Sequence, residues 1–210
     1  MREDELRKII IETIAEYERE PYFTVGVSSR HLHMSKDDLE ILFGAGYELT
    51  PVKELLPGQY SSTDTLTVAG IKGKIERVRV LGPVRKATQL ELSITDSVAL
   101  GVTVPVNESG NLENAGTVIL ENPLNGARIK RVCAIAALRH LHVTPEFASR
   151  HGLRDKQTVS VEFPGRRGIV FGEVLLRVSK DFFDIMHIDT DEANAGSIKS
   201  GDIGKIIARK

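Results

Sequence analysis

Apolar residues recur along most of this chain in short runs bounded by glycine, proline and asparagine, and such runs predict β-strands. The run 89–94 alternates most regularly and places Glu91 on its polar face, opposite Leu90 and Leu92. Many short strands with few long helices indicate small barrels or sandwiches. The predicted strands are residues 24–28, 65–68, 74–81, 89–94, 117–120, 127–132, 132–138, 158–163, 168–171, 174–178, 186–188 and 201–208.

Helical spacing of apolar residues is clearest near the N-terminus, where residues 3–20 predict an amphipathic helix that ends before Pro21. Its apolar stripe consists of Leu6, Ile10, Ile14 and Tyr17. Such a helix either packs on the body of the protein or serves as a docking peptide for a partner, and the sequence leaves both open.

Two shorter helices carry clear start and stop signals. Ser35 begins a capping-box pattern whose helix ends at Gly44. Thr144 caps the second helix, Pro145 takes its first position and Gly152 ends it. Both helices therefore follow the same plan.

A four-residue sequence is repeated shortly before each of these helices. Arg30–His33 and Arg139–His142 both read Arg-His-Leu-His. In an extended strand, residues i and i+2 point to one side, so each copy offers two imidazoles to one point. Four of the six histidines of the chain lie in these two copies. The duplication favours two metal half-sites over paired histidines on a polar strand face, and it predicts two similar domains.

Composition narrows the classes of function. The chain has 210 residues, of which 41% are hydrophobic and 27% charged, as in soluble globular proteins. A net charge of −1 and 5% aromatic residues argue against nucleic-acid binding. No secretory or membrane-spanning run is present, so no membrane partner is expected. Cys133 is the single cysteine and lies in an apolar run, which predicts a buried core residue and suits a reducing cytosol.

Three common settings of His-x-His do not fit. A cupin requires a glutamate a few residues further on, an amidohydrolase barrel requires a longer chain with alternating strands and helices, and zinc fingers require cysteines. A separate polar cluster follows the corner Gly82-Pro83, where Arg85 has the side chain best suited to bind phosphate through two bonds. Local sequence alone favours a solvated charge pair of Arg85 and Lys86.

Four motifs together resemble the PduL-type phosphate acyltransferases, whose prototype is phosphate propanoyltransferase. They are Gly26–Ser35, Leu81–Lys86, Arg139–His142 and Met186–Asn194. The resemblance covers residues 22–208, and the last motif is the most distinctive.

The resemblance implies a mainly β fold of two similar small β-barrels with short capping helices, at residues 22–131 and 132–210, preceded by the helix of residues 1–21. The strand at 24–27 is expected to pair into the second barrel. Two zinc ions would lie between the barrels. By motif, His31, His33 and Glu91 would hold one zinc, His140, His142 and His187 would hold the other, and Arg85 would bind phosphate.

The activity implied is the interconversion of a short-chain acyl-CoA and phosphate with acyl phosphate and coenzyme A, with propanoyl expected and acetyl left open. Three protein ligands per zinc leave a position for substrate. We expect the coenzyme A sulfur at the zinc that Glu91 binds. Phosphate would lie at the other zinc and Arg85 and attack the thioester directly.

Two alternatives stay open. A zinc-dependent acyl-CoA thioesterase or hydrolase would use water in place of phosphate. A non-catalytic zinc-stabilised scaffold domain would have closed sites, for which Asp189 or Asp191 could supply a fourth ligand.

The helix of residues 1–21 resembles the peptides that direct family members into bacterial microcompartments. Core or shell proteins of the compartment would then be its partners. An enzyme free in the bacterial cytoplasm could begin in the same way, and the sequence does not decide whether the chain forms a homo-oligomer.

Overall fold

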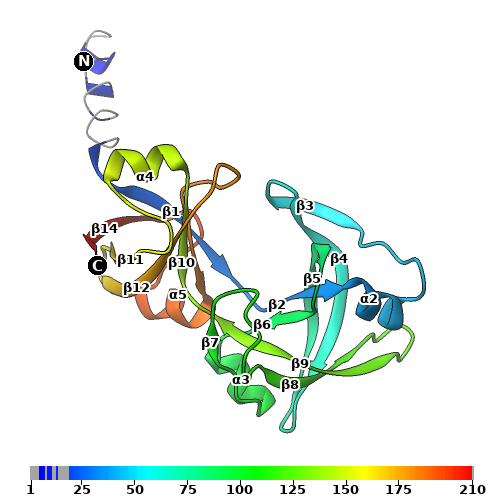
Figure 1. Cartoon of the computed structure of the whole chain (residues 1–210). Coiled ribbons are helices and arrows are strands. Elements are labelled where there is room, and N and C mark those ends of the chain that lie inside the picture. The colour runs from blue at the N-terminus through cyan, green and yellow to red at the C-terminus, as the bar shows by residue number, and fades with distance from the viewer. Residues whose placement is uncertain (1–4, 8, 11–12, 14–18, 210) are drawn as a thin grey trace. The chain divides into compact units, whose positions relative to one another are not determined.

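The computed structural model describes residues 5–7, 9–10, 13 and 19–209 (Figure 1). Nearly half of these residues lie in strands, which loops and short helices connect. They divide into two compact units. The central unit is Ser28–Leu138 with Ile188–Glu192, and the terminal unit comprises the described residues of Met1–Val27, Arg139–His187 and Ala193–Lys210. In the described part of the chain, no helix is long and apolar enough to cross a membrane.

The terminal unit is a closed barrel with the strand order β1-β13-β10-β12-β11-β14. The strands are β1 (Tyr22–Ser28), β10 (His140–Val143), β11 (Thr158–Phe163), β12 (Ile169–Val178), β13 (Ile185–Asp189) and β14 (Ile203–Arg209). Strand β1 comes from the start of the chain and pairs antiparallel with β14 at its end, with Phe23 opposite Gly204. Phe23 and Leu141 are fully buried inside the barrel.

The central unit contains eight strands in the order β3-β4-β5-β2-β6-β9-β7, with β8 paired to both β4 and β9. Six of them, β4, β5, β2, β6, β9 and β8, form a ring of hydrogen-bonded pairs that returns to its start. Leu32, Leu66, Leu90 and Leu120 have no exposed surface and form the centre of its core. The strands are β2 (His31–Ser35), β3 (Pro51–Leu56), β4 (Gln59–Ala69), β5 (Lys74–Arg85), β6 (Gln89–Glu91), β7 (Val106–Asn107), β8 (Gly116–Glu121) and β9 (Arg128–Ala137).

Short helices follow the strands that carry the histidine pairs. Helix α2 (Lys36–Phe43) begins after Ser35, whose hydroxyl accepts a hydrogen bond from the backbone of Asp38. Helix α4 (Pro145–His151) begins after Thr144, which caps it in the same way, and ends at Gly152 in the left-handed conformation. These caps satisfy backbone groups that a helix end leaves unpaired. The remaining helices after residue 21 are α3 (Ile94–Leu100) and α5 (Thr190–Gly196).

The predicted fold class, mainly β with short helices, is confirmed. One predicted strand, at residues 89–94, is too long. Only Gln89–Glu91 form a strand, β6, and Ile94 begins α3. Ser93 caps this helix by accepting a hydrogen bond from the backbone of Asp96, and the capping signal prevails over the alternation of apolar residues. The segments 168–171 and 174–178, predicted as two strands, form the single strand β12.

Two other expectations concern the ends of the domains. The N-terminal helix at 3–20 lies largely outside the described residues, of which 5–7, 9–10, 13 and 19 are helical. The boundary expected between residues 131 and 132 falls inside β9, and the two units divide instead at Leu138 and Arg139. The origin of the two units in one repeated barrel stays a prediction.

Candidate metal centres

In the central unit, strands β2 and β6 bring His31, His33 and Glu91 together. The strands are antiparallel neighbours, and His31 lies directly opposite Glu91. The Nε2 atom of His31 is 3.4 Å from Oε2 of Glu91, and Nε2 of His33 is 3.9 Å from Oε1. One ligand atom from each residue lies within 4.8 Å of the others, so the group can hold a metal ion.

Hydrogen bonds hold one oxygen of the Glu91 carboxylate. Its Oε1 accepts from the Gln89 amide at 2.7 Å and from the Ser109 hydroxyl at 3.0 Å. The Gln89 amide oxygen in turn accepts from the backbone of Gly110 at 2.7 Å, which fixes the orientation of the amide. Because these bonds fall on Oε1, Oε2 faces His31 and remains the oxygen best placed for a metal.

The two imidazoles of this group differ in their surroundings. Nδ1 of His31 lies 2.9 Å from the carbonyl of Ser29, an arrangement that leaves Nε2 for a metal. His33 is 4% exposed, and its Nδ1 has no hydrogen-bond partner. Burial, with the nearby charges of His31 and Arg85, lowers the pKa of His33 to about 3. The ring is therefore neutral near pH 7, the form that binds a metal.

Arg85 lies beside this group, at the end of β5. Its Nη1 donates a hydrogen bond of 3.4 Å to the hydroxyl of Ser109, the same hydroxyl that donates to Glu91. Burial alone would raise the pKa of Glu91, but His31, His33, Ser109 and Arg85 outweigh it and lower that pKa. Glu91 is therefore an ionised carboxylate beside a cation.

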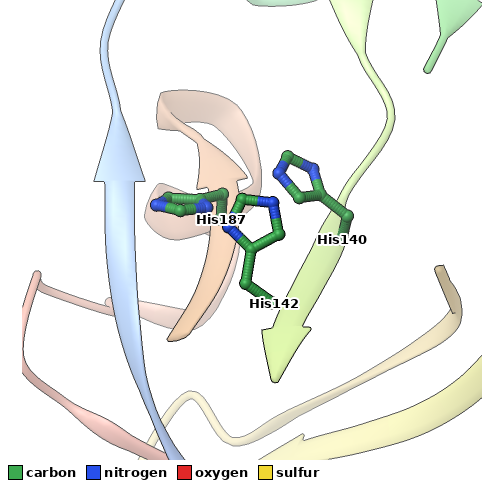
Figure 2. Close-up of side chains that lie close together, drawn as sticks. All are labelled: His140, His142 and His187. Carbon is green, nitrogen blue, oxygen red and sulfur yellow. The ribbon is translucent and has the colours of Figure 1, made fainter. Parts of the chain in front are cut away.

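In the terminal unit, strands β10 and β13 bring His140, His142 and His187 together. His140 lies directly opposite His187 on the antiparallel neighbour. The three rings face one another (Figure 2), with centroids separated by 4.7 to 5.2 Å. Their ligand atoms lie within 4.8 Å of one another, so this group can also hold a metal ion.

His142 is the most enclosed ring of this second group. It is 5% exposed, and neither of its ring nitrogens has a hydrogen-bond partner. The ring of Phe182 stacks on it at 3.9 Å with an interplanar angle of 10°. Burial, with His140 and His187, lowers the pKa of His142 to about 2. Two buried nitrogens without partners are costly unless a ligand such as a metal ion uses one of them.

His187 has little room on its other side, where β1 passes. A Cβ atom added to Gly26 would lie 3.1 Å from Cδ2 of His187 and 3.3 Å from Cδ1 of Ile185. Glycine at this position therefore allows β1 to pass close to the ring.

The two groups are built on the same register. In each, an antiparallel neighbour supplies the third residue, directly opposite the first histidine of the pair: Glu91 opposite His31, and His187 opposite His140. Each strand with a histidine pair also has a parallel neighbour, β5 or β12. The groups differ in charge, because one contains a carboxylate and the other three imidazoles.

The structure thus assembles the six histidine and glutamate residues expected from the sequence into two groups and places Arg85 beside the first. Asp189 and Asp191 belong to neither group among the described residues. Asp191 instead accepts a hydrogen bond from the backbone of Thr95 at the start of α3. Sequence reasoning did not identify Ser109, because its contact with Glu91 depends on the pairing of distant strands. Phe182 and Gly26 likewise carry no sequence signal for their contacts.

Comparison with known proteins relates the chain to one family. The family model described as phosphate propanoyltransferase matches residues 24–199. A phosphate propanoyltransferase of Thermotoga maritima is 51% identical over 191 residues, covering 90% of both chains. One of Lachnoclostridium phytofermentans is 47% identical over 184 residues, 87% of this chain and 86% of that one. One of Clostridioides difficile is 39% identical over 208 residues, 99% of both.

Proposed function

Because the chain belongs to the phosphate propanoyltransferase family, we propose that it interconverts propanoyl-CoA and phosphate with propanoyl phosphate and coenzyme A. Membership makes the chain an acyltransferase of the phosphotransacylase type. The observation that supports the chemistry is the first metal group with Arg85 beside it, where a cation suited to phosphate lies next to a site for a metal ion.

Both donor sets fit Zn²⁺, which takes neutral imidazoles and carboxylates as ligands. His31, His33 and Glu91 would hold one ion, and His140, His142 and His187 the other. Bound zinc would supply Lewis acidity that stabilises the coenzyme A thiolate as it leaves and lowers the charge of phosphate. Three protein donors in each set leave room for a substrate atom.

The two groups suit different substrates. Three neutral imidazoles leave the full charge of their ion available to an anion. Glu91 neutralises part of the charge at the other group, which we assign to the sulfur. Arg85 would bind a phosphate oxygen and orient a second one for attack.

We propose direct transfer of the acyl group. A phosphate oxygen forms a bond to the thioester carbonyl carbon, the carbon–sulfur bond breaks, and its electron pair leaves with sulfur. A cysteine nucleophile is not needed. Cys133 is 2% exposed, and burial raises the pKa of its thiol to about 12, so it is protonated near pH 7. A covalent acyl-enzyme captured in a single turnover would contradict direct transfer.

The proposal is tested by phosphate-dependent release of free thiol from acetyl-, propanoyl- and butanoyl-CoA, with zinc measured on the same samples. We expect about two zinc ions per chain and the highest kcat/KM with propanoyl-CoA. His31→Ala and chelation should both abolish the release. His151→Gln is the matched control, because His151 lies on α4 outside both groups.

Other outcomes would point to other functions. Thiol release that does not depend on added phosphate would indicate a hydrolase. Bound zinc without any acyl transfer would indicate a scaffold domain. Retained activity in metal-free protein would remove zinc from the mechanism.

The role of Arg85 is tested with Arg85→Ala, which should raise the KM for phosphate far more than the KM for acyl-CoA. Lys86→Ala is the matched control, because Lys86 is the adjacent cation and is exposed to solvent. Equal phosphate kinetics in the two variants would remove Arg85 from the phosphate site.

We also propose that the N-terminal segment docks to core or shell proteins of a bacterial microcompartment. Leu6, Ile9 and Ile10 are helical and between 43% and 50% exposed, as an apolar docking face requires. Residues 1–21 fused to a fluorescent protein should enter compartments. A fusion with Leu6 and Ile10 changed to glutamate should not, and equal entry of both fusions would contradict the proposal.

A further inference from the structure

Ser109 joins the proposed metal ligand Glu91 to the proposed phosphate ligand Arg85. Its hydroxyl donates to Oε1 of Glu91 at 3.0 Å. The Oγ atom of Ser109 itself accepts hydrogen bonds from Nε2 of Gln89 at 2.9 Å and from Nη1 of Arg85 at 3.4 Å. A hydroxyl has one hydrogen to donate and two lone pairs to accept with. The three bonds therefore use the whole capacity of this hydroxyl.

The turn that carries Ser109 is held firmly in place. It follows β7, where Asn107 pairs with Ala137 of β9. The side-chain amide of Asn107 spans the turn and donates to the carbonyls of Asn111 and Glu113 at 3.1 and 2.8 Å. The position of the Ser109 hydroxyl is thus set by the strand pairing of the central unit rather than by a free loop.

The Glu91 carboxylate needs such a support more than the third histidine of the other group does. An imidazole offers a given nitrogen from one place on its ring, whereas a carboxylate can rotate and offer either of two equivalent oxygens. The bonds from Gln89 and Ser109 both fall on Oε1. They therefore resist rotation and leave Oε2 toward His31.

We propose that Ser109 is a positioning residue that fixes Oε1 of Glu91 and the guanidinium of Arg85 through one hydroxyl, so that zinc binding and phosphate binding depend on the same group. The inference rests on the proposed function of Glu91 and Arg85. Groups that orient metal ligands typically change metal affinity by about 10- to 100-fold when they are removed.

The test compares Ser109→Thr with Ser109→Val in the full-length chain. The two side chains have the same shape, but only threonine keeps the hydroxyl. Zinc retained against increasing concentrations of a chelator is measured without substrate. The threonine variant should retain both ions like the native protein. The valine variant should lose one ion at about tenfold lower chelator concentration, and Glu91→Gln should lose the same one.

A second measurement follows Arg85. The KM for phosphate should be about threefold higher in the valine variant than in the threonine variant, the effect of one weak hydrogen bond. In an Arg85→Ala background the two variants should have the same KM for phosphate. Ser61→Ala controls for loss of a hydroxyl elsewhere in the central unit, where Ser61 donates only a 3.4 Å bond to the carbonyl of Lys53.

Native zinc retention in both the valine and the threonine variant would overturn the inference. If both variants lose zinc, the Ser109→Ala variant decides, because alanine removes the hydroxyl and adds no atom. Native zinc retention in the alanine variant would overturn the inference, and loss of one zinc ion would support it. These results are separate from the proposed function. Native protein that binds zinc without phosphate-dependent thiol release would contradict the function, whereas the zinc comparison would still test Ser109.

Discussion

The close approach of β1 to His187 gives a sharp test of the terminal metal group, through the substitution Gly26→Ala. The added methyl group would lie 3.1 Å from Cδ2 and 3.4 Å from Nε2 of His187. Carbon atoms pack best at about 3.5 to 4.0 Å, so the ring must move by about 0.5 Å. Metal–ligand distances tolerate only about 0.2 Å. The displacement should therefore weaken zinc binding by His140, His142 and His187 by about tenfold, or about 1.4 kcal/mol.

The measurements are zinc retention against a chelator and phosphate-dependent thiol release from propanoyl-CoA. The matched control is Gly172→Ala in the same unit, because a Cβ at Gly172 would meet nothing closer than Ser160 Oγ at 4.0 Å. Neither glycine has a positive φ angle, so the alanine variants differ in contact rather than in backbone strain. If Gly26→Ala retains zinc and activity as well as Gly172→Ala does, the reasoning about His187 is refuted.

Three further substitutions test other parts of the structure. Burial would raise the pKa of Asp38, but hydrogen bonds from Arg131 and Thr88 outweigh it and lower that pKa. Asp38→Asn should therefore lower the free energy of unfolding by about 2 kcal/mol near pH 7. A lowered folded-state pKa stabilises above the unfolded value of about 3.9, so in denaturant titrations this difference should shrink as the pH falls below about 4, and a constant difference would contradict the ion pair. Cys133→Ala should keep full transfer activity, and the native thiol should react with a thiol reagent only after unfolding, because it is buried. Phe182→Leu should weaken zinc binding by a few-fold, because leucine lacks the flat ring that stacks on His142; unchanged zinc retention would show that the stacking does not position the ring.

Local signals in the sequence predicted the helix ends well. Ser35 and Thr144 cap their helices, and Gly152 ends the second one, because capping depends only on residues a few positions apart. The strand predicted at 89–94 was too long because a local capping signal within it was overlooked. Ser93 and Asp96 carried a local capping signal that the alternation of Leu90 and Leu92 obscured.

The site was predictable where it follows from strand geometry and less so elsewhere. The histidine pairs could be identified from their spacing of two, and the family resemblance supplied Glu91 and His187. That membership is confirmed by the comparisons. The contact of Ser109 with Glu91 joins residues that are distant in the sequence, and no motif near residue 109 predicts it. Such contacts depend on register, which a single sequence does not determine.

The pairing of β1 with β14 has a consequence for how the chain folds as it is synthesised. Phe23 and Val25 emerge early and are almost fully buried in the finished barrel, yet β14, one of the two strands beside β1, begins only at Ile203. The central unit can close its ring of strands before then. Until the last strand leaves the ribosome, β1 presents an unpaired edge with apolar residues, which is a site for wrong pairing and aggregation. A circular permutant with Tyr22–Ser28 placed after Arg209 would remove this delay.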